Sequence, residues 1–271
     1  MFLLAALCCL SLSQQFSAPQ AKTEFIASTI GNLPNSVGVV PGKTFQVAVH
    51  MKMAPGWHSY YLNPGESGMA TKIEWRLPPG FTAGPIRWPV PTRIVVGGVA
   101  GNVYENDAWL VTDITPPKSW WPTQRLEVIV AKVSWLLCRE ACVPQKSSLS
   151  ITIDETKIGL PNPAFAPALR NLPAAGEVVK CKAWVEGKTA VLSLDGHRSG
   201  KGAVKFFPSD ATYFGADLPK IDTTDSGIKL EIPLSKYAPS LPKRLSGILV
   251  LPQTGDGGSG AHWIDVQVTK R

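Results

Sequence analysis

Alternation of apolar and polar side chains is the pattern that most restricts what this chain can fold into. In the longest example, residues 43 to 53, one face carries Phe45, Val47, Val49, Met51 and Met53. The intervening residues are Thr44, Gln46, Ala48, His50 and Lys52. A period of two residues is that of a half-buried β-strand. We therefore expect a strand here, with one face in a core.

Shorter runs repeat this pattern at 73–77, 149–153 and several later positions. The sequence has 24 Gly and 24 Pro, which suits short strands joined by turns. No stretch carries the pattern of a long amphipathic helix. The pattern predicts an all-β protein built as an antiparallel sandwich.

One run changes phase. Apolar residues at Leu126, Val128 and Val130 are followed by apolar residues at Val133, Trp135 and Leu137. A slip of one residue is the mark of a β-bulge, expected near Ala131 and Lys132.

The chain is expected to divide into two β domains. Residues 160–173 contain the Pro-rich string PNPAFAPALRNLP, with one short helix opening at Pro163. Strand-like runs resume after it. The expected parts are a sandwich domain over 22–158, a linker over 159–175 and a second, smaller β-rich domain over 176–271.

The first residues, MFLLAALCCLSL, are apolar and lead into SQQFSAPQA. About 12 apolar residues are too few to span a bilayer, which needs roughly 20. They resemble the hydrophobic part of a secretory signal. We expect residues 1–21 to be a signal peptide that directs the protein to the periplasm, with membrane contact only through partners.

The net charge is +7, but the basic residues are scattered among acidic ones, without a basic run or interleaved aromatic residues. That distribution argues against nucleic acid as a partner. The sequence has no GxSxG, HExxH or P-loop motif, which leaves hydrolase, metalloprotease and nucleotidase activities without support. We expect no cofactor.

Removal of the signal peptide leaves three cysteines, and Cys138 and Cys142 stand in WLLCREACVPQ. On an extended strand, residues four apart lie about 13 Å from each other, whereas the Cα atoms of a disulfide lie about 4.4–6.8 Å apart. If the two are bridged, the segment between them must reverse the chain or form a helical turn. So short a ring stabilises by only about 2 kcal/mol and suits exchange, although a structural bridge stays open.

Three stretches carry a resemblance to a known family. The stretch GWHSYYLNPGESGMATKIEWRLPPGF (56–81), with WPVPTRI and WLLCREACVPQ, resembles the N-terminal domain of the thiol:disulfide interchange protein DsbD family, in its Cys-x3-Cys, copper-sensitivity-like branch. The resemblance covers roughly residues 24–155. It implies an immunoglobulin-like sandwich that relays electrons in the periplasm, in the setting of cytochrome c biogenesis.

The resemblance also implies partners. Family members exchange electrons with thioredoxin-like proteins and with a membrane electron carrier. This sequence shows neither a multi-span membrane region nor a CxxC thioredoxin-like region, so we expect its electrons to come from a separate protein. The implied activity is that of a thiol–disulfide oxidoreductase.

Site residues follow from the same resemblance. Cys142 would form the mixed disulfide with a partner, and Cys138 would resolve it. A cap segment over residues 95–107 would cover the pair, with Tyr104 as its covering ring. By the same resemblance Trp57, Tyr60 and Tyr61 would line the site, although packing in the core or at its rim stays open for them. Arg139 and Glu140, which stand between the two cysteines, are also expected at the site.

Two other functions stay open. The first is a non-catalytic β-sandwich adaptor whose disulfide only pins a loop. The second is periplasmic copper handling, for which Met51, Met53 and Met69 lie near His50 and His58 in the sequence. Methionine at inward strand positions is more often core, and we expect no metal site.

Overall fold

The computed structural model describes residues 21–30, 35–120, 127–154, 160–174, 179–197, 203–224, 226–252 and 260–270. Apart from Ala21, the expected signal peptide lies outside these ranges. Within them strands predominate, and the helical segments are η1 (Pro163–Phe165) and α1 (Ala166–Arg170). The all-β expectation is confirmed.

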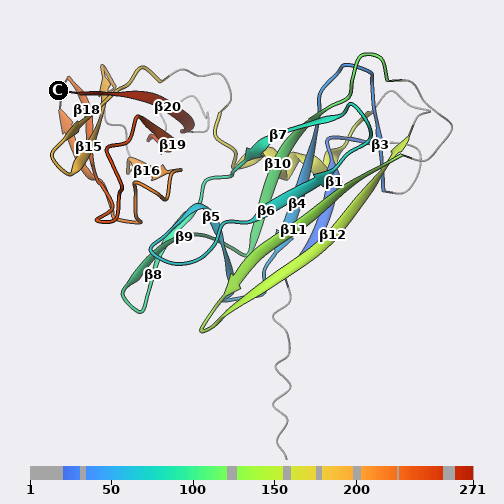
Figure 1. Ribbon diagram of the computed structural model, residues 1–271, viewed down its shortest axis with the longest axis horizontal. Coiled ribbons are helices and arrows are strands. Elements are labelled where there is room, and N and C mark those ends of the chain that lie inside the picture. The colour runs from blue at the N-terminus through green and yellow to red at the C-terminus, as the bar shows by residue number, and fades with distance from the viewer. Residues whose placement is uncertain are drawn as a thin grey trace, which may run out of the picture.

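An N-terminal sandwich is formed by two facing sheets (Figure 1). The first has the order β1-β4-β10-β7 and is antiparallel throughout. Its strands are β1 (Lys22–Ala27), β4 (Phe45–Lys52), β10 (Asp107–Thr115) and β7 (Thr82–Arg87). The strand after β1 in the chain, β2 (Thr29–Ile30), pairs with β13 (Leu160–Pro161) in a separate small ladder.

The second sheet of the sandwich runs β3-β12-β11-β5-β9-β8, with β6 also paired to β11. Its β3–β12 ladder is parallel. The strands are β3 (Ser36–Gly38), β12 (Cys142–Asp154), β11 (Val128–Cys138), β5 (His58–Gly65), β9 (Val99–Glu105), β8 (Thr92–Val96) and β6 (Lys72–Arg76). Apolar side chains of both sheets fill the space between them, including Val49, Leu110, Ile129, Trp135 and Ile151.

Strand β4 confirms the alternation and adds a second buried face. Phe45, Val47, Val49 and Met51 lie in the sandwich core. Ala48 on the opposite face is buried as well, because it packs with Val111 against the segment η1–α1. The expectation of a half-buried strand is therefore incomplete, since the Pro-rich segment covers its outer face.

The β-bulge expected near Ala131 and Lys132 is wrong. Strand β11 pairs with β12 in one uninterrupted register from Val128 to Cys138. Its core face is formed by Ile129, Ala131, Val133, Trp135 and Leu137. The apparent phase slip arose because Val128 and Val130 are apolar residues on the outer face of a regular strand.

A seven-stranded C-terminal sheet follows, in the order β16-β19-β20-β14-β15-β18-β17 within the described residues. Side chains of Phe206, Phe214 and Ile264 fill its own core. Phe207 and Ile248 instead join the core of the sandwich, so the two parts share an apolar contact. The strands are β14 (Lys182–Glu186), β15 (Thr189–Asp195), β16 (Lys205–Pro208), β17 (Lys220–Thr224), β18 (Gly227–Pro233), β19 (Arg244–Val250) and β20 (Ala261–Lys270).

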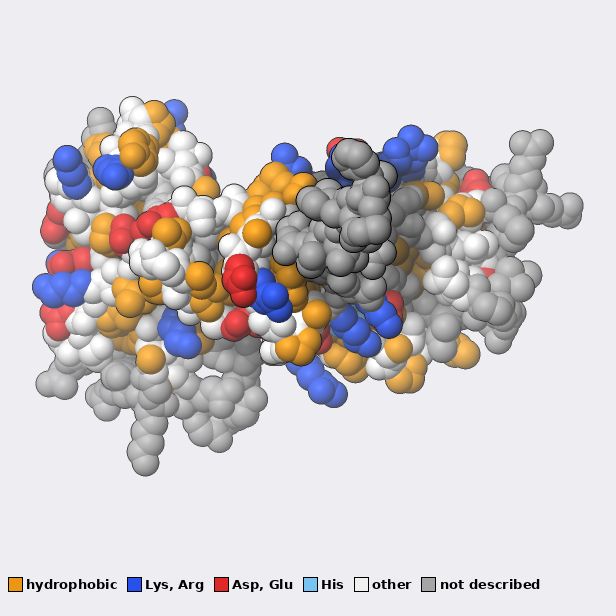
Figure 2. Space-filling model, turned by 90° about the horizontal axis from the view of Figure 1, so that it is seen from below, with side chains coloured by type: hydrophobic (Ala, Val, Ile, Leu, Met, Phe, Trp, Pro, Cys, Tyr) orange, Lys and Arg blue, Asp and Glu red, His pale blue; other side chains and the backbone are white. Residues whose placement is uncertain are grey.

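Charged side chains of both signs are mixed over the face shown in Figure 2, without a continuous basic stripe. In the described part of the chain, no helix has the length and apolar character needed to cross a membrane.

We expect Phe165→Ala to lower the free energy of unfolding by about 3–5 kcal/mol, because the ring is buried against Ala48 and Val111 and its loss leaves a cavity. Urea unfolding measures the effect. Leu169→Ala is the matched control: its side chain is 47% exposed, and its cost should stay within about 0.5 kcal/mol. Equal costs for the two variants would show that η1–α1 does not cover the sheet as described.

Candidate functional site

The two cysteines of the Cys-x3-Cys motif close a β-hairpin. Strand β11 ends at Cys138 and β12 begins at Cys142, and the two residues face each other in the ladder. Between them the chain reverses, with the N–H of Arg139 donating to the carbonyl of Ala141 at 3.2 Å. The Cα atoms are 4.1 Å apart, near the spacing of about 4.5 Å for non-hydrogen-bonded cross-strand pairs. A disulfide joins Cys138 and Cys142.

The environments of the two sulfur-bearing residues differ. Cys138 is only 3% exposed and packs against Tyr60 and Val103, with Ile94 and Leu136 at the edge of this cluster. Cys142 is exposed. An incoming thiolate can therefore reach the disulfide from the side of Cys142, while Cys138 is shielded.

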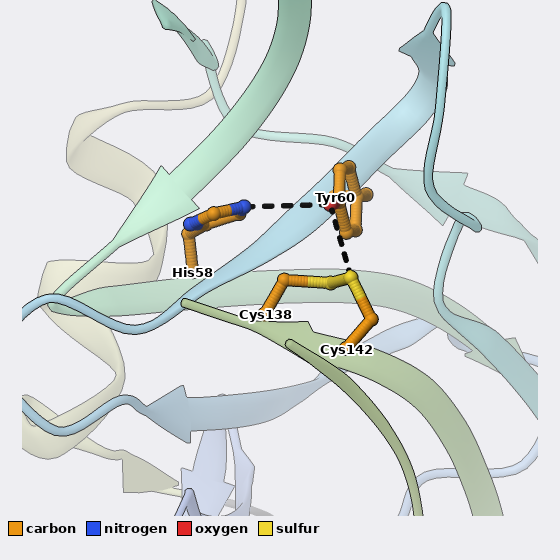
Figure 3. Close-up of a disulfide and its surroundings, with 4 residues drawn as sticks. All are labelled: His58, Tyr60, Cys138 and Cys142. Atoms are coloured by element: carbon orange, nitrogen blue, oxygen red, sulfur yellow. Dashed lines mark hydrogen bonds between the residues drawn. A yellow bond between two sulfur atoms is a disulfide. The ribbon is translucent and has the colours of Figure 1, made fainter. Parts of the chain in front are cut away.

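Tyr60 lies directly beside the disulfide, as Figure 3 shows. Its hydroxyl oxygen is 3.9 Å from Sγ of Cys142 and 3.4 Å from Nε2 of His58. A disulfide sulfur has no proton, so the tyrosine hydroxyl is the donor to it. When the hydroxyl donates to the sulfur, Nε2 of His58 is the donor to the tyrosine oxygen.

Burial perturbs both of these groups. It raises the pKa of Tyr60, so this hydroxyl keeps its proton at neutral pH. It also lowers the pKa of His58, and the nearby Glu105 carboxylate opposes this only in part. Near neutral pH the site therefore presents a neutral imidazole and a protonated phenol to the disulfide.

The β8–β9 hairpin forms one wall of a concave site of about 200 Å³ over the disulfide. Its two-residue turn, Gly97 and Gly98, has φ angles of 59° and 82°, which glycine adopts without a steric cost. Strand residues of the hairpin line the site on one side: Ile94, Val96, Val99, Gly101 and Val103. The first part of the expected cap segment thus borders the disulfide.

The structure does not bring Tyr104 to the disulfide. Its ring stacks on Trp88 at 6.5 Å between centroids, and its hydroxyl donates to the carbonyl of Pro89 at 2.8 Å. Tyr61 lies in the same core and packs edge-on against Trp88. Burial raises the pKa of both phenols, and the neighbouring Tyr61 adds to the rise at Tyr104. Tyr60 occupies the place beside the sulfur instead.

The other expected site residues lie at the mouth. Arg139 and Glu140 are exposed and line the concave site. The guanidinium carbon of Arg139 is 5.3 Å from the ring centroid of Trp57, which is a cation–π contact. Arg139 directly follows Cys138 in the sequence. Val96 and Val99 fall within the expected cap segment, whereas Ile94 lies outside it and was not expected to line the site.

The residues considered for copper do not come together. Met51 and Met53 are buried in the sandwich core, while Met69 is exposed. His50 stacks on Trp109 at 3.7 Å on the opposite face of β4 from Met51. Among the described residues, no group of three or more His, Cys, Asp or Glu side chains could hold a metal ion.

A further thiol, Cys181, lies half-buried at the edge of the C-terminal core. Burial raises the pKa of its thiol, which disfavours the reactive thiolate.

Comparison with solved structures shows a likeness in fold that spans both parts of the chain. The N-terminal periplasmic domain of ScsB from Proteus mirabilis matches at 17% sequence identity with a TM-score of 0.60, covering 85% of this chain and 91% of that one. At this identity the likeness shows a shared fold.

Other structures match less well. The major pilin subunit BcpA of Bacillus cereus matches at 8% identity and a TM-score of 0.29, covering 93% of this chain and 69% of that one. A fragment of the major pilin GBS80 of Streptococcus agalactiae matches at 9% identity and a TM-score of 0.30, covering 92% of this chain and 91% of that one. Neither likeness bears on the site.

No curated protein matches the sequence of this chain. Residues 33–153 match the family described as "Thiol:disulfide interchange protein DsbD, N-terminal". This range contains both sandwich sheets apart from β1 and the last residue of β12, and it includes the disulfide hairpin. The resemblance seen in the sequence is thereby confirmed: the chain carries a DsbD N-terminal-like domain.

Proposed function

We propose that this chain is a periplasmic thiol–disulfide oxidoreductase that relays electrons between a thioredoxin-like donor, or a membrane electron carrier, and partner oxidoreductases. The observation that carries the proposal is the asymmetry of the Cys138–Cys142 disulfide, with one exposed and one buried cysteine, inside a DsbD N-terminal-like domain. We assign this activity to residues 22–158, with 159–175 as a linker and 176–271 as a second domain.

Loading of electrons begins with a thiolate of the donor attacking Sγ of Cys142. The bond from that sulfur to Cys138 breaks, a donor–Cys142 mixed disulfide forms, and Cys138 leaves as a thiolate that takes up a proton. The second thiolate of the donor then attacks its own sulfur in the mixed disulfide. Cys142 leaves as a thiolate, the donor becomes a disulfide, and two electrons have passed to the cysteine pair.

Unloading runs the same chemistry on a second partner. The Cys142 thiolate attacks the partner's disulfide, which forms a new mixed disulfide and releases one partner thiolate. Cys138 then attacks Cys142 within the hairpin, restores the Cys138–Cys142 bond and releases the reduced partner. The 4.1 Å Cα separation supports this resolving step, because the two cysteines need no backbone rearrangement to rejoin.

The surface around Cys142 suits transient docking of another protein. Val96 is 54% exposed at the tip of the β8–β9 hairpin, and Val95 and Val99 are exposed beside it. Arg139 and Glu140 flank this apolar patch. Desolvation of the valines favours association.

Tyr60 is placed to stabilise the Cys142 thiolate. A hydrogen bond to the charged form favours thiolate over thiol, and the buried hydroxyl keeps its proton to donate. In the disulfide the same hydroxyl faces the sulfur that the donor attacks.

Replacement of single cysteines tests the role of each sulfur. In Cys138→Ala, mixed disulfides through Cys142 should accumulate with a thioredoxin-like partner, because no resolving thiol remains. Cys142→Ala should trap far less, because the remaining Cys138 is buried. Non-reducing electrophoresis with mass spectrometry of the linked peptides gives the yields.

Two outcomes would contradict the proposal. Equal trapping by both variants would remove the assigned roles. If a reduced thioredoxin-like donor fails to reduce the folded wild-type disulfide, the protein is instead an adaptor with a structural bridge. The double variant Cys138→Ala/Cys142→Ala would then keep partner binding and lose only stability.

Loss of the Tyr60 hydroxyl should slow Cys142. In reduced Tyr60→Phe, we expect alkylation of Cys142 by iodoacetamide at pH 7 to be roughly fivefold slower, from the loss of about 1 kcal/mol of hydrogen bonding to the thiolate. The pH at which alkylation is half-maximal should rise. Tyr237→Phe removes the same group from an exposed position and should react like wild type. Unchanged kinetics in Tyr60→Phe would show that the hydroxyl does not act on the sulfur.

His58 should make stability depend on pH. Its pKa is lowered in the folded protein by burial, opposed by Glu105 on β9, while Cys138 faces it on β11. As the pH falls below about 6.5, the unfolded chain takes up the proton first, so the free energy of unfolding declines down to the folded-state pKa. Above that range the contribution is constant.

In urea unfolding between pH 7.5 and pH 5, His58→Gln should therefore show a shallower decline than wild type. Met69→Leu, which changes an exposed side chain without a titratable group, is the control and should keep the wild-type slope. A His58→Gln slope equal to that of wild type would rule out this contribution.

A further inference from the structure

The β8–β9 hairpin has two faces, and only one of them borders the disulfide. Side chains alternate along a strand, so Ile94 and Val103 point to the disulfide while their neighbours Arg93 and Asn102 point away from it. Arg93 and Asn102 are register partners across the hairpin. The polar side chains on this second face have no part in the proposed thiol–disulfide exchange.

A turn of the C-terminal sheet meets that second face. The Arg93 guanidinium donates to the carbonyl of Ala216. Burial lowers the pKa of Arg93, and the nearby Asp217 carboxylate opposes this in part. Gly65 at the end of β5 also approaches Ala216, where a Cβ on the glycine would lie 2.6 Å from the Cβ of Ala216. The contact is tight and includes a cation.

Asn63 extends the contact into the sandwich. Its side chain is fully buried, and its Nδ2 donates to the carbonyl of Phe214 at 3.0 Å. Its Oδ1 accepts from the N–H of Gly65, and its own carbonyl accepts from Nδ2 of Asn102 at 3.0 Å. One buried amide thus links β5, β9 and the C-terminal turn.

The turn itself is anchored in the C-terminal core. The side chain of Phe214 is buried in the C-terminal core, and the N–H of Phe214 donates to the carbonyl of Asp210 at 3.1 Å. The carbonyl of Tyr213 accepts from Ser235 at 2.7 Å. Figure 1 shows the C-terminal strands on the side of the sandwich from which β8 and β9 project.

We infer that the C-terminal sheet acts as a clamp on the exchange site, with Arg93 and Asn63 as positioning residues. They tie the base of the β8–β9 hairpin to the turn at residues 214–217, and the hairpin keeps Ile94 and Val103 packed on Cys138. Release of the clamp exposes Cys138 without touching either sulfur. The inference rests on the proposed exchange function for its purpose, although the contact can be tested without it.

Arg93→Ala tests the clamp. In the reduced protein, hydrogen exchange of the amides over residues 92–105 should speed up, and alkylation of Cys138 should be about tenfold faster than in wild type, because a charge-assisted hydrogen bond is lost. Arg76→Ala is the matched control, since it removes an exposed arginine from β6 of the same sheet. Arg93→Lys should restore most of the protection, which simple loss of packing would not predict.

A thermal unfolding curve for each variant separates local opening from global loss of structure. If Arg93→Ala is poorly folded, Asp217→Ala provides the second variant: it removes the exposed carboxylate near Arg93, and hydrogen exchange over 92–105 should rise to a smaller extent. Unchanged exchange in folded Arg93→Ala and in Asp217→Ala would overturn the clamp.

The clamp and the redox function can fail independently. If a thioredoxin-like donor reduces the wild-type disulfide but hydrogen exchange of the β8–β9 amides is unchanged in Arg93→Ala, the thiol–disulfide exchange function stands and the clamp is ruled out. If Arg93→Ala speeds up both hydrogen exchange of these amides and alkylation of Cys138, but no donor reduces the wild-type disulfide, the clamp stands and the redox function is ruled out.

Discussion

The site depends on one covalent constraint, a disulfide across the last pair of a β-hairpin. Cross-strand partners lie on the same face of a sheet, so the bridge needs only a reversal of the three residues between Cys138 and Cys142. Strand β5 flanks Cys138 on the side away from β12, whereas in the described part of the chain no strand pairs with β12 at Cys142 on the side away from β11. The difference in exposure between the two cysteines therefore follows from where the hairpin stands in the sheet.

Much of the fold could be predicted from alternation alone, because burial on one face of a strand imposes a period of two. The core face of β4 follows directly from Phe45, Val47 and Val49. The burial of Ala48 could not be foreseen, since it depends on where η1–α1 packs. The regular course of β11 was hidden for a related reason: Val128 and Val130 are apolar on the outer face, and only the register with β12 shows which face is core.

The candidate site was predictable in its sulfurs and less so in its aromatic residues. Spacing and motif were enough to select Cys138 and Cys142. Tyr60 and Tyr61 are adjacent, so only one can face the disulfide, and the choice depends on the pairing of β5 with β9 and β11. The same pairing turns Tyr104 inward, because it lies opposite Ser59 and one residue away from Val103. The positions of all three tyrosines therefore depend on long-range strand register, which no local stretch of sequence encodes.

This register also explains how the site of the proposed exchange can be both protected and accessible. The β8–β9 hairpin has a free glycine tip, where a Cβ on Gly97 or Gly98 would meet no atom within 4 Å, and a base fixed by buried hydrogen bonds of Asn63 and Asn102. Local opening is least costly where few buried contacts must break, so movement is favoured at the tip and resisted at the base. In the proposed function, a partner displaces the exposed valines near Cys142 while Ile94 and Val103 stay on Cys138. Cys138 is thus kept from solvent while Cys142 is presented, as the proposed roles of resolving and attacking sulfur require.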